Sequence, residues 1–78
     1  MATVIVYTKN SCIACSMTKK YLKKKDLEYI EYFIDKDMVK LEELKSKGYL
    51  SVPVVEIYED DKMIKSWAGF VPDELNKL

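Results

Sequence analysis

The feature that most limits the fold is a β-branched, nearly continuous apolar run followed at once by residues with helical spacing. Residues 3–8 (Thr-Val-Ile-Val-Tyr-Thr) predict a central strand that is buried on both faces. Residues 9–11 break this run, and residues 12–25 then predict a helix. The apolar positions of this helix are Ala14, Met17, Tyr21 and Leu22, with Thr18 on the same face. A strand that leads directly into a helix favours a right-handed β-α-β unit with parallel strands.

The middle of the chain continues this alternation of strand and helix. Residues 27–34 predict a second strand, and Asp35 or Asp37 can cap the helix that follows. That helix is expected to end at Gly48, because glycine is favoured just past a helix C-terminus. Its apolar stripe consists of Met38, Leu41 and Leu44.

The last third of the chain predicts a hairpin and a short helix. Residues 54–58 and 63–67 are two strands whose short polar connection favours antiparallel pairing, and Pro72 opens a final helix. The complete order, β-α-β-α-β-β-α, predicts an α/β fold with a four-stranded mixed sheet flanked by helices. Because the sequence contains no repeat, low-complexity stretch or linker, residues 1–78 are expected to form a single domain.

Charge and hydropathy limit the partners. The chain has 13 basic and 13 acidic residues, and this formal charge of zero argues against nucleic acid as the main partner. No apolar run approaches the roughly 18 residues that cross a bilayer, and no secretory signal is recognised. We therefore expect a cytoplasmic protein that contacts no membrane, with a monomer as the default. Lysines 23–25 are interpreted as the end of a helix rather than as a binding site.

Cys12 and Cys15 are the most reactive groups in the sequence, which contains no histidine and therefore no imidazole base. Their spacing at a helix start brings both sulfurs to one face, close enough to bond. Cys12 is also expected to lie at the unpaired N–H groups and positive dipole end of the helix, which favours its thiolate form. We expect Cys12 to attack a substrate disulfide and Cys15 to resolve the mixed disulfide.

Three alternative roles of the cysteine pair are less favoured. A structural zinc site needs four ligands, so two cysteines without histidine would require carboxylates or a second chain. A static disulfide is disfavoured in a reducing cytoplasm. Two buried, inert cysteines remain an alternative, but burial does not account for a pair at a strand-to-helix turn. A CxxC sequence at this place in a β-α-β pattern favours redox chemistry.

Two further segments accompany the cysteines. The Val52-Pro53 bond precedes a strand, and together with the CxxC sequence this favours a cis peptide that presents the Val52 backbone to a partner chain. Trp67 and Phe70 flank Gly69 just beyond a strand. They are equally consistent with core positions and with a recognition surface.

These elements together resemble the glutaredoxin-like NrdH redoxins of the thioredoxin/glutaredoxin superfamily, over essentially the whole chain. The resemblance includes Val6-Tyr7-Thr8-Lys9 before Cys12-Ile13-Ala14-Cys15, then Gly48, then Ser51-Val52-Pro53-Val54-Val55. Its most telling part is residues 67–73 (WAGFVPD), which look like the family stretch W-S-G-F-x-P-[DE].

The resemblance implies a thioredoxin fold and the activity of a small thiol-disulfide oxidoreductase. Such proteins accept electrons from thioredoxin reductase, which draws on NADPH through flavin, and pass them to the class Ib ribonucleotide reductase. The chain itself is expected to hold no cofactor and no metal, because its redox group is the Cys12–Cys15 disulfide. Val52 and Pro53 are expected to support this site, and Trp67 and Phe70 to fix the nearby loop through packing and hydrogen bonds. Partner contacts are expected from Ile13, Ala14, Trp67, Ala68, Gly69 and Phe70.

Three positions depart from the family pattern. Ala14 stands where glutamine is usual, Ala68 where serine is usual, and Val71 where arginine is common. These changes affect the hydrogen bonds of the loop and the docking surface more than the fold or the exchange chemistry.

Two alternative functions remain. In a glutathione-dependent glutaredoxin, Lys9 and Ser51-Val52-Pro53 could hold part of the tripeptide, but the usual Gly-Gly pair is missing and Trp67 to Phe70 occupy its place. A non-enzymatic metal or iron–sulfur module would need four thiolates, hence a second chain or added glutathione.

Overall fold

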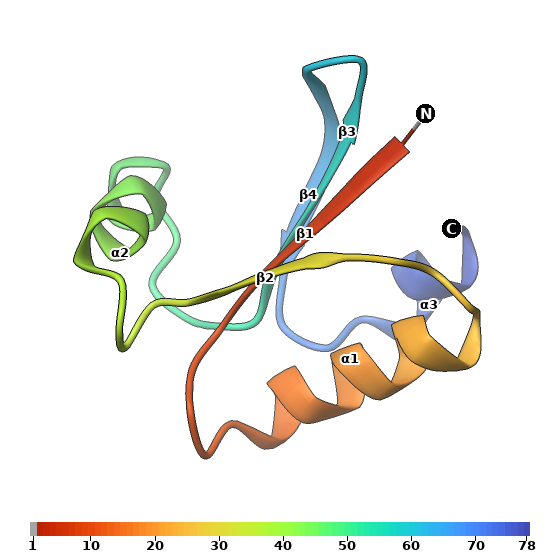
Figure 1. Ribbon diagram of the computed structural model, residues 1–78, viewed down its shortest axis with the longest axis horizontal. Coiled ribbons are helices and arrows are strands. Elements are labelled where there is room, and N and C mark those ends of the chain that lie inside the picture. Colours follow the sequence, from red (N-terminus) through yellow and green to blue (C-terminus); the bar gives the residue numbers. More distant parts are fainter. Residues whose placement is uncertain (1) are drawn as a thin grey trace.

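A computed structural model describes residues 2–78 and contains, over that range, three helices and one four-stranded sheet (Figure 1). The strands are β1 (Ala2–Thr8), β2 (Ile30–Phe33), β3 (Val54–Glu59) and β4 (Lys62–Ala68). The helices are α1 (Ile13–Lys24), α2 (Met38–Ser46) and α3 (Pro72–Asn76). The order of the elements is the one that the sequence predicts.

The sheet has the strand order β2-β1-β3-β4 and mixes two kinds of pairing. Strands β1 and β2 are parallel, whereas β3 is antiparallel to both β1 and β4. Val6 pairs with Val55, which in turn pairs with Trp67, so these three residues form one row across the sheet. The predicted β-α-β start, hairpin and mixed four-stranded sheet are therefore confirmed.

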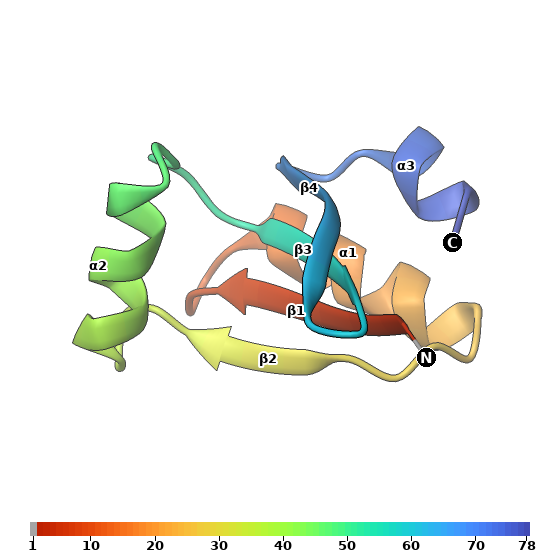
Figure 2. The same cartoon turned by 90° about the horizontal axis from the view of Figure 1, so that it is seen from above.

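The sheet separates two hydrophobic clusters, because α1 and α3 cover one face and α2 lies on the other (Figures 1 and 2). Alternate residues of a strand point to opposite faces, so β1 contributes to both clusters. The cluster beneath α1 and α3 consists of Val4, Val6, Leu22, Val55, Ile57 and Leu75. The smaller cluster beneath α2 consists of Tyr7, Leu44 and Val54.

The hairpin and β2 differ in length from the prediction. Asp60 and Asp61 both have positive φ values, 48° and 70°, and form a tight turn that lets Glu59 pair with Lys62. Each hairpin strand is therefore longer than predicted. Strand β2 is shorter, because residues 27–29 form the connection from α1 and the Leu27 N–H donates to the carbonyl of Leu22.

The apolar stripes of the first two helices were also predicted imperfectly. Met17 is 44% exposed and Met38 is 64% exposed, so neither is a core residue. Helix α1 buries Thr18 and Leu22, as predicted, together with Cys15. Thr18 can be buried because its hydroxyl donates to the carbonyl of Ala14 within the helix, which satisfies the polar group away from water.

The predicted helix ends are largely confirmed. The Asp37 carboxylate caps α2 by accepting from the Lys40 N–H at 3.2 Å, and Gly48 follows the helix with φ +90°. Pro72 opens α3. The Lys25 ammonium donates to three main-chain carbonyls at or beyond the C-terminal end of α3: those of Leu75, Asn76 and Leu78. None of the helices within residues 2–78 is long and apolar enough to cross a membrane.

Candidate active site

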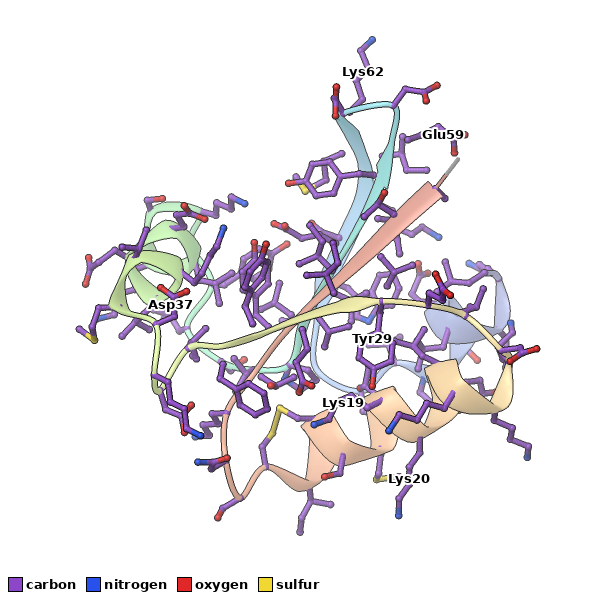
Figure 3. All side chains as sticks on the ribbon, viewed as in Figure 1. Lys19, Lys20, Tyr29, Asp37, Glu59 and Lys62 are labelled. Atoms are coloured by element: carbon purple, nitrogen blue, oxygen red, sulfur yellow. A yellow bond between two sulfur atoms is a disulfide. The ribbon has the colours of Figure 1, made fainter. Side chains whose placement is uncertain are left out.

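Cys12 and Cys15 form a disulfide at the start of α1, visible as the yellow bond in Figure 3. Cys12 is the N-cap of the helix, with an extended backbone, and the two Cα atoms lie 5.2 Å apart. The Cys15 N–H donates to the Cys12 sulfur at 3.2 Å. A backbone donor and the positive end of the helix dipole therefore both act on this sulfur, and both stabilise negative charge there.

The two sulfurs differ in access. Cys15 is 1% exposed, whereas Cys12 is partly exposed. Cys12 borders an open groove of about 740 Å³ that also includes Lys9, Ile13 and Phe33. Both cysteines line the groove, but a substrate that enters it meets the partly exposed Cys12, because Cys15 is almost completely buried.

The Val52-Pro53 peptide bond is cis, as predicted. The carbonyl oxygen of Val52 lies 4.0 Å from the Cys12 sulfur, and Pro53 itself is buried. The Gly69 N–H donates to the Pro53 carbonyl at 2.7 Å, so the segment after β4 is held against the segment before β3. Long-range contacts thus bring Val52 to Cys12 and Gly69 to Pro53.

Trp67 and Phe70 lie against the cluster beneath α1 and α3, both partly buried. The Phe70 ring centroid is 6.2 Å from that of Tyr21 on α1. The expected packing is therefore present, but the buried indole N–H of Trp67 has no hydrogen-bond partner among residues 2–78. Neither aromatic residue lines the groove at Cys12, although Phe70 lines a second groove along α1.

The remaining expected contact residues differ in exposure. Ile13 is 80% exposed at the mouth of the groove, and Ala68 is exposed at the end of β4. Ala14 is only partly exposed, and its carbonyl accepts from Thr18. Ile13 is thus the most accessible side chain between the two cysteines.

A polar cluster beside the groove was not predicted. The hydroxyl of Thr8, which is fully buried, donates to the Glu31 carboxylate at 2.8 Å, and Lys19 donates to the same oxygen at 2.7 Å. Lys19 also lines the groove and points from α1 toward β2 in Figure 3. The only feature of the sequence that could have placed Lys19 near the cysteines is its position four residues, or about one helical turn, after Cys15. The pairing with Glu31 depends on how α1 crosses β1 and β2.

No group of three or more metal-ligating side chains (His, Cys, Asp or Glu) is found within residues 2–78. The arrangement at Cys12 and Cys15 suits reversible disulfide exchange, because one sulfur is accessible, the other is buried, and the two can bond.

Comparison with known proteins shows the family. Residues 4–64 match the model of the glutaredoxin family. The chain is 36% identical over 75 residues to the glutaredoxin-like protein NrdH of Lactococcus lactis, covering 96% of this chain and 97% of that one. It is 32% identical to the NrdH protein of Escherichia coli, covering 96% of this chain and 86% of its relative. The chain belongs to the glutaredoxin-like NrdH redoxins.

The structure agrees with this assignment. It superimposes on the NrdH-redoxin of Escherichia coli, a protein described for its thioredoxin-like activity profile, with a TM-score of 0.84 and 30% identity. The superposition covers 97% of this chain and 93% of the other. The chain is therefore a redoxin with the thioredoxin fold, in a family of thiol-disulfide oxidoreductases, and the predicted fold and family are confirmed.

Proposed function

We propose that this redoxin takes electrons from thioredoxin reductase and uses them to reduce protein disulfides, in particular the disulfide of a class Ib ribonucleotide reductase. The observation that carries the proposal is the partly exposed Cys12 at the N-cap of α1, bonded to the buried Cys15. A thiol pair with one accessible member suits a carrier that meets large partners.

In the proposed mechanism Cys12 is the nucleophile and Cys15 the resolving thiol. The Cys12 thiolate, stabilised by the Cys15 N–H, attacks one sulfur of the substrate disulfide. A mixed disulfide forms, and the other substrate sulfur leaves as a thiolate that takes a proton from solvent. Cys15 then loses its proton and attacks Cys12, which closes the Cys12–Cys15 disulfide and releases the second substrate thiol. Two electrons pass to the substrate, and the reductase restores the dithiol.

Val52 and Pro53 are assigned the role of aligning the substrate backbone. The carbonyl of Val52 lies 4.0 Å from the Cys12 sulfur, while that of Pro53 already accepts from Gly69. Val52 therefore keeps a main-chain group close to the reacting sulfur. We assign the partner contacts to Ile13, Ala14 and the segment from Trp67 to Phe70, in which Trp67 acts mainly by holding the segment in place.

The residues around Gly69 favour thioredoxin reductase over glutathione as the electron source of this redoxin. Trp67 and Phe70 are bulky, and both pack onto the protein where a glutathione-binding redoxin has a second glycine. On this proposal NADPH and flavin act only within the reductase. The redoxin works in the cytoplasm as a monomer, with residues 1–78 forming a single domain.

The test compares two electron sources for the reduction of one protein disulfide, following the loss of NADPH. Thioredoxin reductase is one source, and glutathione with glutathione reductase is the other. Turnover with the first source alone supports the proposal, and the oxidised class Ib ribonucleotide reductase is then tested as substrate. Turnover with glutathione alone would assign a glutaredoxin activity instead. The Cys12→Ser variant serves as the blank in both assays.

A further inference from the structure

Helix α1 has an uneven charge distribution that the net charge of zero conceals. It carries four lysines, at positions 19, 20, 23 and 24, and no acidic residue. Lys19 is neutralised by Glu31 at 2.7 Å. Lys20 and Lys24 are exposed, lie one turn apart, and form no ion pair with any side chain within residues 2–78. The outer face of α1 is therefore positively charged beside a redox site.

An apolar surface lies between these two lysines. A groove of about 210 Å³ is lined by Met17, Lys20, Tyr21, Lys24 and Phe70. Met17 is 44% exposed. The ring of Tyr21, on α1, lies near that of Phe70, in the segment before α3, with the ring planes inclined by 60°. The Tyr21 hydroxyl donates to the side-chain oxygen of Asn76, which fixes the ring. We call these five residues the basic groove.

The basic groove is continuous with the groove at Cys12, because Met17 and Lys20 line both. Lys20 points away from the sheet, on the outer side of α1 (Figure 3). At 1.5 Å per helical residue, Lys20 lies about 12 Å and Lys24 about 18 Å along the axis from Cys12. An extended peptide spans the first distance with roughly four residues and the second with roughly five or six.

We propose that the basic groove binds the acidic flank of a disulfide-bearing protein segment, with carboxylates roughly four to six residues from the cysteine that Cys12 attacks. Lys20 and Lys24 attract the carboxylates, while Met17 and Phe70 contact an apolar side chain between them. This inference rests on the proposed function and names the substrate class that the site prefers. Lys23 and Lys24 lie in the last turn of α1, as predicted, and Lys24 in addition lines the groove.

The test uses two disulfide-bonded synthetic peptides that differ only in two flanking residues, glutamate in one and glutamine in the other. The redoxin is reduced chemically and freed of reductant, so that a single turnover is measured without any reductase. The measured quantity is the ratio of the rate constant for the acidic peptide to the rate constant for the neutral peptide. This ratio is insensitive to changes in the intrinsic reactivity of Cys12, because both peptides present the same disulfide.

We expect the wild-type redoxin to prefer the acidic peptide and to lose this preference in high salt. Lys20→Gln and Lys24→Gln should each lower the ratio by roughly two- to fivefold, as for other exposed ion pairs. Lys62→Gln is the matched control, because it removes one exposed lysine at the hairpin turn, far from α1 (Figure 3). It should leave the ratio unchanged.

The outcomes separate the two proposals. If the wild-type redoxin, Lys20→Gln and Lys24→Gln all reduced the two peptides at equal rates, the proposed binding of acidic segments to the basic groove would be wrong. The oxidoreductase activity itself would still stand. A redoxin that leaves both peptides oxidised would overturn the proposed function as well. If Lys62→Gln lost the preference for the acidic peptide to the same extent, the preference would be an effect of the net charge of the protein. That result would also contradict binding at the basic groove.

Discussion

The two faces of the sheet are stabilised in different ways. Beneath α1 and α3 the core is aliphatic, and the redox site lies at the end of this layer. Beneath α2 the smaller cluster adjoins Glu56, a fully buried carboxylate on the central strand β3. Burial of apolar surface does not depend on pH, whereas a buried carboxylate is tolerated only with partners. The face beneath α1 and α3 thus has an aliphatic core with the Thr8–Glu31–Lys19 cluster beside the redox site, whereas the face beneath α2 has a carboxylate buried next to its core residues.

Three groups make the burial of Glu56 possible. Lys47, at the end of α2, donates to it at 2.8 Å, and the hydroxyls of Tyr7 and Tyr58 donate at 3.1 and 3.2 Å. The hydrogen bond to Glu56 raises the pKa of Lys47. Burial, and then the charge of Glu56, raise the pKa values of Tyr7 and Tyr58. The contact between Lys47 and Glu56 also ties α2 to the sheet.

The largest effect should come from the cysteines, on the α1 side. Cys12→Ser is expected to abolish disulfide reduction, because the attacking thiolate is lost. Cys15→Ser should still attack but stall as a mixed disulfide, detectable by mass spectrometry. Glu56→Gln, on the opposite face, should leave the rate constant per folded molecule near the wild-type value. Turnover of Cys15→Ser at the wild-type rate would disprove the assigned roles of the two thiols.

Next come the leucines that anchor one helix to each face. Leu22 of α1 is fully buried in the larger cluster, and Leu44 of α2 is nearly so in the smaller one. Leu22→Ala should lower the free energy of unfolding by about 3 kcal/mol and Leu44→Ala by about 2 kcal/mol. Urea denaturation measures both. A larger loss for Leu44→Ala would mean that the α2 face holds more of the core than its few buried residues indicate.

A loss of about 2 kcal/mol, below that of Leu22→Ala and similar to that of Leu44→Ala, is expected for Lys47→Met at neutral pH. Removing one partner of a buried pair costs more than this when both are buried, but the Lys47 side chain is 35% exposed, so solvent compensates in part. The measurement is again urea denaturation, with Lys45→Met as control because Lys45 pairs only at the surface with Glu42. Equal losses in the two variants would show that Glu56 does not need Lys47.

The same cluster sets the behaviour in alkali. Lys47 and Tyr7 both have folded-state pKa values above their unfolded values of 10.5 and 10.0, so the folded protein holds these protons more tightly. Their contribution is therefore complete below those values and is lost as the pH rises beyond them. We expect the free energy of unfolding to fall above pH 10. The fall should be shallower in Lys47→Met and in Tyr7→Phe.

The smallest effects distinguish two glycines with similar backbones. Gly48 ends α2 with φ +90°, and Gly69 follows β4 with φ +89°. At either position an added Cβ would lie more than 4 Å from every atom beyond the adjacent residues of the chain, so alanine is disfavoured by the backbone alone, at about 1 kcal/mol. Gly48→Ala should change stability without changing activity. Gly69→Ala should also slow disulfide reduction, because the Gly69 N–H holds Pro53 beside Cys12. Equal activities of the two variants would remove Gly69 from the site.

Much of the fold was predictable from local patterns. The order of the elements, an aspartate cap on α2 (Asp35 or Asp37, of which Asp37 is the cap), the end of α2 at Gly48 and the start of α3 at Pro72 each depend on a few neighbouring residues. The CxxC sequence was predicted at the start of α1 for the same reason. Met17 was misplaced because helical spacing identifies a stripe but does not say which residues the sheet covers.

The sequence by itself determined where the elements lie, that Cys12 and Cys15 begin a helix, and the family to which the chain belongs. The tertiary structure alone decided which charges are neutralised. Glu56 looked like an ordinary strand residue, yet it is buried because Lys47 and two tyrosines converge on it. Lys19 and Lys20 are adjacent in sequence, yet only Lys19 finds Glu31. Ion pairs and burial depend on residues that are far apart along the chain. Local sequence patterns therefore do not predict which of these residues meet in the folded protein.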